Sequence, residues 1–419
     1  MVWVGGLIVL ATFVAIVKRY ETRMVLFLSG LLMSILAMKP AAAIDEFSAA
    51  MINSGLVPVI CTVMGFAFVM KQTKCDSHLV HLLAGFLTRF RPILIPGTVL
   101  VTFAINIALP SAAGCAAAVG AILIPTLMSA GVHPAIAACA VLAGTWGSVF
   151  NPGNAHNPFI AKLAGISDPM VVIQGHTVAA LAAAAVVATA LTIVAMVRKE
   201  DRGHETEVVD GASSSEFKVD FLKAIVPVVP LLLLVLGSQK IKLLPWEVTV
   251  PQAMIFGVIL GFVVTLKKPQ DISKQFFAGM GDAYGSVIGI IIAAAVFTKG
   301  MALIGLTGAL IDVMKHSEQI AKVAATFGPF VVAVLSGSGD ASTLAFNGAI
   351  TPYAKQFGYE ITQMGSEAFL SGALGRSMSP VAGATIVCAT LAGVNPVEIA
   401  KRNAPGMIVA AVVTMFILL

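Results

Sequence analysis

"LAGTWGSVFNPGNAHNPFIAKLAGI" (residues 142–166) and "LSGALGRSMSPVAGATIVCATLAGV" (residues 370–394) are two versions of one pattern, 228 positions apart. They align without a gap, and both end in or near a Leu-Ala-Gly tripeptide. Two glycines and a proline also coincide: Gly144, Gly147 and Pro152 fall on Gly372, Gly375 and Pro380. Agreement of glycines, a proline and a tripeptide at one spacing indicates an internal repeat.

The repeat extends beyond these two stretches. The same offset aligns "VICTVMGFAFVMK" (Val59–Lys71) with "VIGIIIAAAVFTK" (Val287–Lys299). With one gap, "PSAAGCAAAVGAILIP" (Pro110–Pro125) aligns with "GSGDASTLAFNGAITP" (Gly337–Pro352). We therefore predict a first repeat over residues 1–198 and a second over residues 220–419. The hydrophilic stretch 199–219 is predicted to be a cytoplasmic linker between them.

The composition is that of an integral membrane protein. Hydrophobic residues make up 58% of the chain and charged residues 11%, whereas a soluble domain has about 25% charged residues. The five cysteines have no paired spacing, so we expect buried thiols and no metal site. No nucleic-acid patch is visible. The apolar start, residues 1–17, lacks a basic region before it and is interpreted as a membrane span.

The apolar segments predict an all-α polytopic fold. Eight are long enough to span or nearly span a bilayer: residues 3–17, 24–43, 56–70, 171–197, 221–238, 250–266, 284–298 and 397–418. Residues 134–165 and 360–393 are long but interrupted by Gly, Pro, Asn and Ser, and are predicted to be broken helices. Residues 92–129 and 318–354 have small, polar centres and are predicted to be re-entrant hairpins. Each half then has five spans, and an odd number requires the two repeats to be inverted.

The distribution of basic residues supports this topology. With the N-terminus outside, seventeen of the 26 Lys and Arg residues fall in cytoplasmic connections, as the positive-inside rule requires. Counting the hairpins as full spans would place the linker and its arginines on the other side. We therefore predict that both termini are periplasmic.

The broken segments indicate transport. Irregular backbone at membrane depth persists only where protein or a water-filled cavity covers it. Paired interruptions in two inverted halves mark a substrate site near the midplane, and half-helix N-termini there favour an anion. The chain has no phosphate-binding loop for a nucleotide. We therefore expect a secondary transporter without a bound cofactor, driven by H⁺ or Na⁺ or by exchange.

Three stretches carry a family resemblance: residues 276–311, "SGSGDASTLAF" (residues 336–346), and "LGRSMSPVAG" with "NPVEIAKR". The chain resembles the anaerobic C4-dicarboxylate carriers of the DcuC type, within the ion-transporter superfamily. The resemblance implies a bacterial inner-membrane carrier for succinate, fumarate, malate or similar carboxylates. It also implies a scaffold and a mobile transport domain, an elevator-like motion and a homodimer. Gly339–Asp340 stands where the family pattern has Gly-Asn, and "NPGNAHNP" (residues 151–158) also differs.

The candidate site residues lie at the tips and breaks. Arg376 provides a planar fork of donors that matches a carboxylate, with an ion pair to Asp340 or Glu367 as the structural alternative. Asp340 could carry a proton, bind Na⁺ or balance Arg376. The predicted substrate-binding residues are Ser111, Asn151, Asn154, His156, Asn157, Ser338, Arg376, Ser377 and Ser379. The predicted coupling-ion residues are Asp340, Ser342 and Thr343.

Three other functions compete with this prediction. "GSGD" (residues 337–340) matches the signature of intramembrane aspartyl proteases, but that chemistry needs a second membrane aspartate. A cation/proton exchanger of the same superfamily would need a site dominated by acids. A carrier for another organic anion, such as a tricarboxylate, keto acid or sulfonate, stays open.

Overall fold

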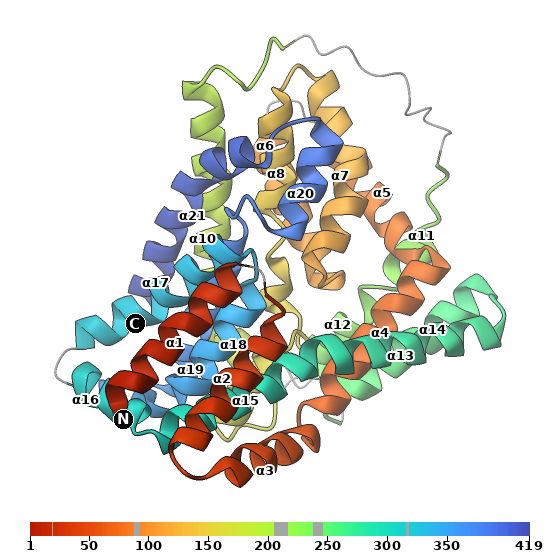
Figure 1. The fold of residues 1–419 in the computed structure, drawn as a ribbon. Helices are drawn as coiled ribbons and strands as arrows, with labels where there is room; N and C mark the ends of the chain where they lie inside the picture. Colours follow the sequence, from red (N-terminus) through yellow and green to blue (C-terminus); the bar gives the residue numbers. More distant parts are fainter. Residues whose placement is uncertain (19, 88–92, 205–216, 238–245, 316–317) are drawn as a thin grey trace.

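The computed structural model describes the chain except residues 19, 88–92, 205–216, 238–245 and 316–317. The described residues form helices and connecting turns without a strand (Figure 1). Helices satisfy their own backbone hydrogen bonds, which is what an apolar chain needs inside a bilayer. The all-α prediction is therefore confirmed for the described residues.

The first half of the chain contains ten α-helices and a short 3₁₀ helix among the described residues. They are α1 (Val2–Val17), α2 (Thr22–Leu36), α3 (Pro40–Met51), α4 (Val57–Thr73), α5 (Cys75–Leu87), α6 (Leu94–Ala108), α7 (Ala112–Ser129), α8 (Pro134–Ala143), η2 (Gly147–Phe150), α9 (His156–Leu163) and α10 (Pro169–Val197).

The second half of the chain begins after the linker. Its elements are α11 (Phe221–Ile225), α12 (Val229–Leu236), α13 (Val250–Thr265), α14 (Pro269–Ala283), the π-helical turn η3 (Tyr284–Ile288), α15 (Gly289–Leu303), α16 (Leu306–Lys315), α17 (Glu318–Ser336), α18 (Gly339–Ala349), η4 (Thr351–Phe357), α19 (Ile361–Arg376), α20 (Gly383–Ala392) and α21 (Pro396–Leu418).

Two predicted spans are interrupted. The segment 24–43 ends as a helix at Leu36, because Met38 has a left-handed φ of 59° and Pro40 begins the separate helix α3. The segment 221–238 divides into α11 and α12, where Pro227 lacks a backbone donor. The predicted span 284–298 is instead the middle of one long helix, because η3 joins α14 to α15 without a break.

Both predicted hairpins are helix–turn–helix units. α6 and α7 are joined by a turn at residues 109–111, and α17 and α18 by a turn at residues 337–338. Ser111 caps α7 and Ser338 caps α18 through their side-chain oxygens. Gly337 has a φ of 78°, a backbone conformation that favours glycine.

Both predicted helix breaks are present, and each packs against its own hairpin in the same way. A Cβ added to Gly147 would lie 1.9 Å from the carbonyl oxygen of Phe103 on α6. A Cβ added to Gly375 would lie 2.3 Å from the carbonyl oxygen of Phe330 on α17. Only glycine fits at either position, because backbone approaches backbone there. Gly147 and Gly375 therefore allow each broken helix to pack closely against the first helix of a hairpin, α6 or α17.

The largest buried core joins both hairpins to both broken helices. It runs through α5 to α10, α17 and α19 to α21, in residues from Ile95 and Leu123 to Leu370 and Met407. A smaller core joins α4 with α13 and α14, and another joins α1, α2 and α15 with parts of α16 and α17. In Figure 1, α6, α7, α8 and α20 gather at the top, whereas α4, α13 and α14 lie at the lower right.

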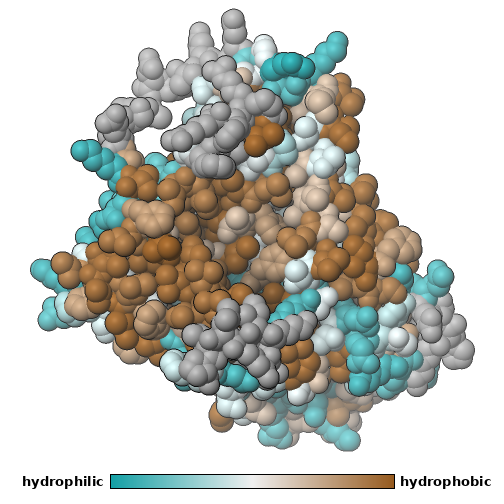
Figure 2. Space-filling view, turned by 180° about the vertical axis from the view of Figure 1, so that it is seen from behind, coloured by the Kyte–Doolittle hydropathy of each residue, from teal (hydrophilic) through white to brown (hydrophobic). Residues whose placement is uncertain are grey.

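The surface is that of a membrane protein. Figure 2 shows apolar residues over much of one face, with hydrophilic residues toward its upper and lower edges. Among the described residues, five helical stretches are long and apolar enough to cross a membrane: residues 112–129, 169–197, 269–303, 319–336 and 396–418. Seven shorter apolar helices accompany them. All five cysteines are buried and free, as expected.

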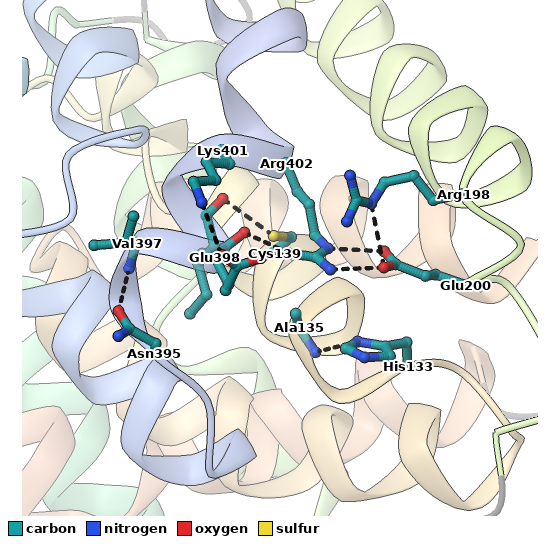
Figure 3. A network of polar contacts seen from close by, with 11 residues as sticks. His133, Ala135, Cys139, Arg198, Glu200, Asn395, Val397, Glu398, Lys401 and Arg402 are labelled. Atoms are coloured by element: carbon teal, nitrogen blue, oxygen red, sulfur yellow. Dashed lines mark hydrogen bonds and ion pairs between the residues drawn. The ribbon is translucent and has the colours of Figure 1, made fainter.

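The start of the predicted linker packs tightly on the second half (Figure 3). Glu200 accepts two hydrogen bonds from Arg402 on α21, at 2.6 and 2.7 Å, and a third from Arg198. Arg402 also contacts Glu398. Glu200 and Arg402 are both buried. The first residues after α10 are therefore part of the folded body, whereas residues 205–216 lie outside the described chain.

Candidate functional site: a cavity between hairpin tips and helix breaks

One cavity brings together the two hairpin tips and the two helix breaks. It has a volume of about 330 Å³. Ser111 from the first tip and Asp340 from the second face it, with Asn154 from the first break and Arg376 from the second. Ile60 and Met64 of α4 and Val287 of η3 complete the wall. Segments far apart in sequence thus converge on a space large enough for a small organic ion.

Four helices begin at this cavity. The lining includes the first residues of α7 (Ala112 and Ala113), α9 (His156), α18 (Gly339 and Asp340) and α20 (Gly383 and Ala384). The first peptide N–H groups of a helix have no acceptor within the helix. The helix dipole adds a partial positive charge at the same end. Four such ends around one space favour an anion.

Arg376 ends α19 and faces the cavity half-buried. Its Nη2 donates to the carbonyl oxygen of Thr145 at 2.8 Å, and its Nη1 lies 3.4 Å from the Thr145 hydroxyl. These bonds join the break of the second repeat to that of the first. Among the described residues, Arg376 has no ion pair with Asp340 or Glu367, so its charge is not neutralised by a direct contact there.

Asp340 pairs with His156 instead. The Asp340 Oδ1 lies 3.0 Å from His156 Nε2, which joins the second hairpin tip to the first helix break. The imidazole is buried, and it stacks on Phe369 with ring centroids 4.2 Å apart. The Asp340 side chain is 72% exposed, toward the cavity. When His156 is protonated the pair has no net charge, and Arg376 leaves the cavity with one positive charge.

Six predicted site residues line the cavity: Ser111, Asn154, His156, Asp340, Thr343 and Arg376. The other six do not line it. Asn151 donates to the Ile107 carbonyl on α6, Asn157 donates to backbone carbonyls of the first break, and Ser377 donates to the Ala373 carbonyl. Ser338 and Ser379 accept from nearby backbone N–H groups, and the Ser342 hydroxyl donates to the Gly339 carbonyl. These six fix the backbone that shapes the cavity.

Sequence reasoning did not select several other residues of the cavity wall. Ser148 accepts from the Asn154 amide at 3.2 Å, and its own N–H donates to Asn106. Trp146 and Phe369 supply aromatic walls. Ser148 lies within the quoted first break and could have been selected with it. Phe369 gives no signal, because an apolar residue in an apolar helix looks like core.

The described residues contain no cluster of three or more His, Cys, Asp or Glu side chains that could hold a metal ion. Of the predicted coupling-ion residues, Asp340 and Thr343 face the cavity and Ser342 is buried behind it. Thr343 donates to the Ala368 carbonyl at 3.2 Å, so its oxygen still has free lone pairs.

The model of the DcuC family, described as a C4-dicarboxylate anaerobic carrier, matches residues 5–419. The chain belongs to this family. It is 22% identical to the anaerobic C4-dicarboxylate transporter DcuC of Escherichia coli K12, over 98% of this chain and 95% of the relative. Two proteins of Haemophilus influenzae, each named only as an uncharacterized transporter, are more similar. One is 41% identical over 62% of this chain and 97% of its own length, and the other 56% identical over 31% and 89%.

Membership of the DcuC family identifies this protein as a multi-pass membrane transporter and not an enzyme. The protease alternative is thereby excluded.

Proposed function

We propose that this protein carries C4-dicarboxylates such as succinate, fumarate or malate across the bacterial inner membrane, with the cavity as the substrate site. The observation that carries the proposal is the convergence of four helix N-termini and Arg376 on one space. One substrate carboxylate would bind the Arg376 guanidinium, and the other would bind the free N–H groups at the opposite helix ends. The name of the Escherichia coli relative supports the substrate class.

The proposed mechanism is alternating access of the elevator type. The first hairpin, α17 of the second hairpin, both breaks, α10 and α21 share one core, whereas α4 and η3 contribute the opposite cavity wall. A substrate between two packed bodies is carried when one body moves against the other. We infer two inverted repeats of five spans, re-entrant hairpins, a scaffold, a transport domain and a homodimer as parts of this mechanism. In Figure 1 both chain ends lie below the upper end of α10, after which the linker begins; this arrangement supports the proposal that the termini are periplasmic and the linker cytoplasmic.

Coupling to H⁺ or Na⁺, or exchange of one dicarboxylate for another, would drive the movement. Asp340 and Thr343 line the same cavity as the proposed substrate site, which supports their proposed role in binding the coupling ion. The experiment is counterflow of labelled succinate in proteoliposomes, with and without Na⁺ and across pH. Saturable counterflow that unlabelled fumarate competes for supports the proposal. If counterflow occurs only with a tricarboxylate, keto acid or sulfonate, the proposed substrate class is wrong, but the cavity can still be the anion-binding site.

A further inference from the structure

A second acidic site lies inside the helix bundle, away from the cavity. Glu367, on α19, is fully buried and does not line the cavity. The Ser371 hydroxyl donates to its Oε1 at 2.9 Å, and the Thr414 hydroxyl of α21 lies 3.1 Å from the same oxygen. Its Oε2 is buried without a hydrogen-bond partner. The hydroxyl of Thr326 on α17 also lies against the carboxyl.

The hydrogen-bond directions leave a place for one proton. The Thr326 hydroxyl donates to the Lys322 carbonyl oxygen at 3.1 Å. Ser371 supplies a hydrogen to Oε1, which needs none from the carboxyl itself. In the ionised carboxyl, Oε2 would be a buried charged oxygen without a donor, whereas a proton on Oε2 makes the group neutral. A buried carboxylate without compensation is far less stable than the neutral acid.

The internal repeat supplies a natural comparison. At the offset of 228, Glu367, Ser371 and Thr414 correspond to Cys139, Ala143 and Val186. The first half packs the equivalent helices with these small or apolar residues, all buried or half-buried. The architecture thus does not need a carboxyl and hydroxyls at this place. The polar cluster belongs to the second half alone, and an acid inside a membrane protein is functional by default.

Charged and titratable groups approach this site from three sides. Lys322, on α17, is close enough for its charge to act on the carboxyl, and its Nζ lies 4.5 Å from the centre of the Phe416 ring. On α10, His176 contacts the hydroxyl of Ser366, next to Glu367 in sequence, at 3.1 Å. On α9, His156 stacks on Phe369. Ionised Glu367 would gain an attraction to Lys322, so the two protonation states favour different arrangements of α17 and α19.

We propose that Glu367, with Ser371, Thr414 and Thr326, forms a buried proton-binding site whose protonation controls movement of the transport helices. The inference rests on the proposed function for its role in transport, but the proton site itself does not depend on the substrate. Proton binding converts the carboxylate to the neutral acid and leaves no charge in the bundle. Proton release pairs the carboxylate with Lys322 and changes how α17, the first arm of the second hairpin, packs on α19.

The first experiment detects the proton directly. Infrared difference spectra of purified protein in lipid nanodiscs, recorded between acid and alkaline buffer, report the carbonyl stretch of a buried protonated carboxylic acid. The wild type should show this band, Glu367→Gln should lose it, and Ser371→Ala should shift it because a hydrogen bond is lost. Asp340→Asn, a matched control at the cavity, should keep it. A band unchanged in Glu367→Gln would overturn the proposal.

The second experiment measures transport. Glu367→Gln keeps an oxygen to accept from Ser371 and Thr414 but cannot titrate. It therefore tests the effect of losing the proton-binding group while the packing of the site is preserved. We expect wild-type succinate counterflow to change several-fold across pH, Glu367→Gln to lose this dependence, and Glu367→Asp to restore part of it. A pH profile identical to the wild type contradicts the proposal. A Na⁺-dependent rise in thermal midpoint that Glu367→Gln abolishes would instead make this a sodium site. If no dicarboxylate is transported, the infrared band still decides the proton site, and only the proposed function fails.

Discussion

At the scale of single residues, the charge of Arg376 distinguishes an anion site from a structural contact. Its guanidinium bonds the backbone and hydroxyl of Thr145 and retains free donors toward the cavity. Arg376→Lys keeps the charge but loses the planar fork, so we expect dicarboxylate affinity to fall by about 1.5–3 kcal/mol, roughly 10- to 100-fold. Arg376→Ala should lose at least as much. Isothermal titration of succinate checks both variants, and unchanged affinity in folded Arg376→Ala would mean that the anion binds elsewhere.

The pair of Asp340 and His156 allows a second prediction at this scale. Asp340→Asn removes the negative charge from the cavity and keeps a side chain that can contact His156 Nε2. We expect the variant to fold, and the pH dependence of succinate binding to change because the cavity loses an ionisable carboxyl group. The Na⁺ dependence should also change if Asp340 binds the coupling ion. Binding curves across pH and Na⁺ that superimpose on the wild type would exclude Asp340 from both roles.

At the scale of elements, the seating of each broken helix on its hairpin depends on one glycine. Gly375→Ala would force a methyl group against the Phe330 carbonyl oxygen, and a backbone atom cannot turn away as a side chain can. Such overpacking costs typically about 1–3 kcal/mol. Gly281→Ala on α14 is the matched control, because a Cβ there meets nothing within 4 Å. A lower thermal midpoint should appear in Gly375→Ala and not in Gly281→Ala. Equal midpoints would show that the α17–α19 contact can relax.

The elements that the sequence predicts well are those that glycine and proline delimit. The breaks at Gly147–Pro152 and Gly375–Pro380 and the tips at Ser111 and Asp340 follow from the repeat, and the structure places both tips and both breaks at one cavity. The helices α3, α5, α14 and α16 were not predicted, because their polar residues interrupt the apolar runs.

Contacts between distant positions give no local signal. Arg376 and Thr145 are 231 residues apart, and Arg402 and Glu200 are 202 apart. Glu367 was expected only as a partner of Arg376, and the structure instead buries it against Ser371 and Thr414. These pairings depend on how whole helices pack, which neither periodicity nor composition specifies.

At the scale of the whole molecule, Glu200 ties the start of the linker to the second half. The Arg402 hydrogen bonds hold the pKa of Glu200 below its ordinary value. Its stabilising contribution is therefore complete above the ordinary glutamate pKa, about 4.3, and is lost as the pH falls through the lower folded pKa. Glu200→Gln leaves a buried arginine with only Glu398, and we expect a loss of about 3 kcal/mol at neutral pH. The partly exposed Glu398→Gln should lose less. Thermal midpoints across pH check this, and the Glu200→Gln deficit should shrink in acid.

The last prediction tests the proposed elevator motion, in which the transport domain moves against the scaffold. α15 packs with α1 and α2 in a core that Ala349, the last residue of α18, also joins. In the proposed elevator motion α15 belongs to the scaffold and α18, as part of the second hairpin, to the transport domain. A Cβ added to Gly348 on α18 would lie 3.3 Å from the Thr298 hydroxyl on α15, within reach of a disulfide. In a variant whose native cysteines are replaced, Gly348→Cys with Thr298→Cys should therefore form a cross-link between the bodies.

That cross-link should stop counterflow, and a reducing agent should restore it, because an elevator motion must separate α18 from α15. The matched control joins α21 to α10 inside one body, since a Cβ on Gly406 would lie 3.3 Å from the Ala190 Cβ. Gly406→Cys with Ala190→Cys should cross-link and leave counterflow intact. Full counterflow in the cross-linked Gly348 and Thr298 variant would show that these helices move together, and the boundary between moving bodies would have to lie elsewhere.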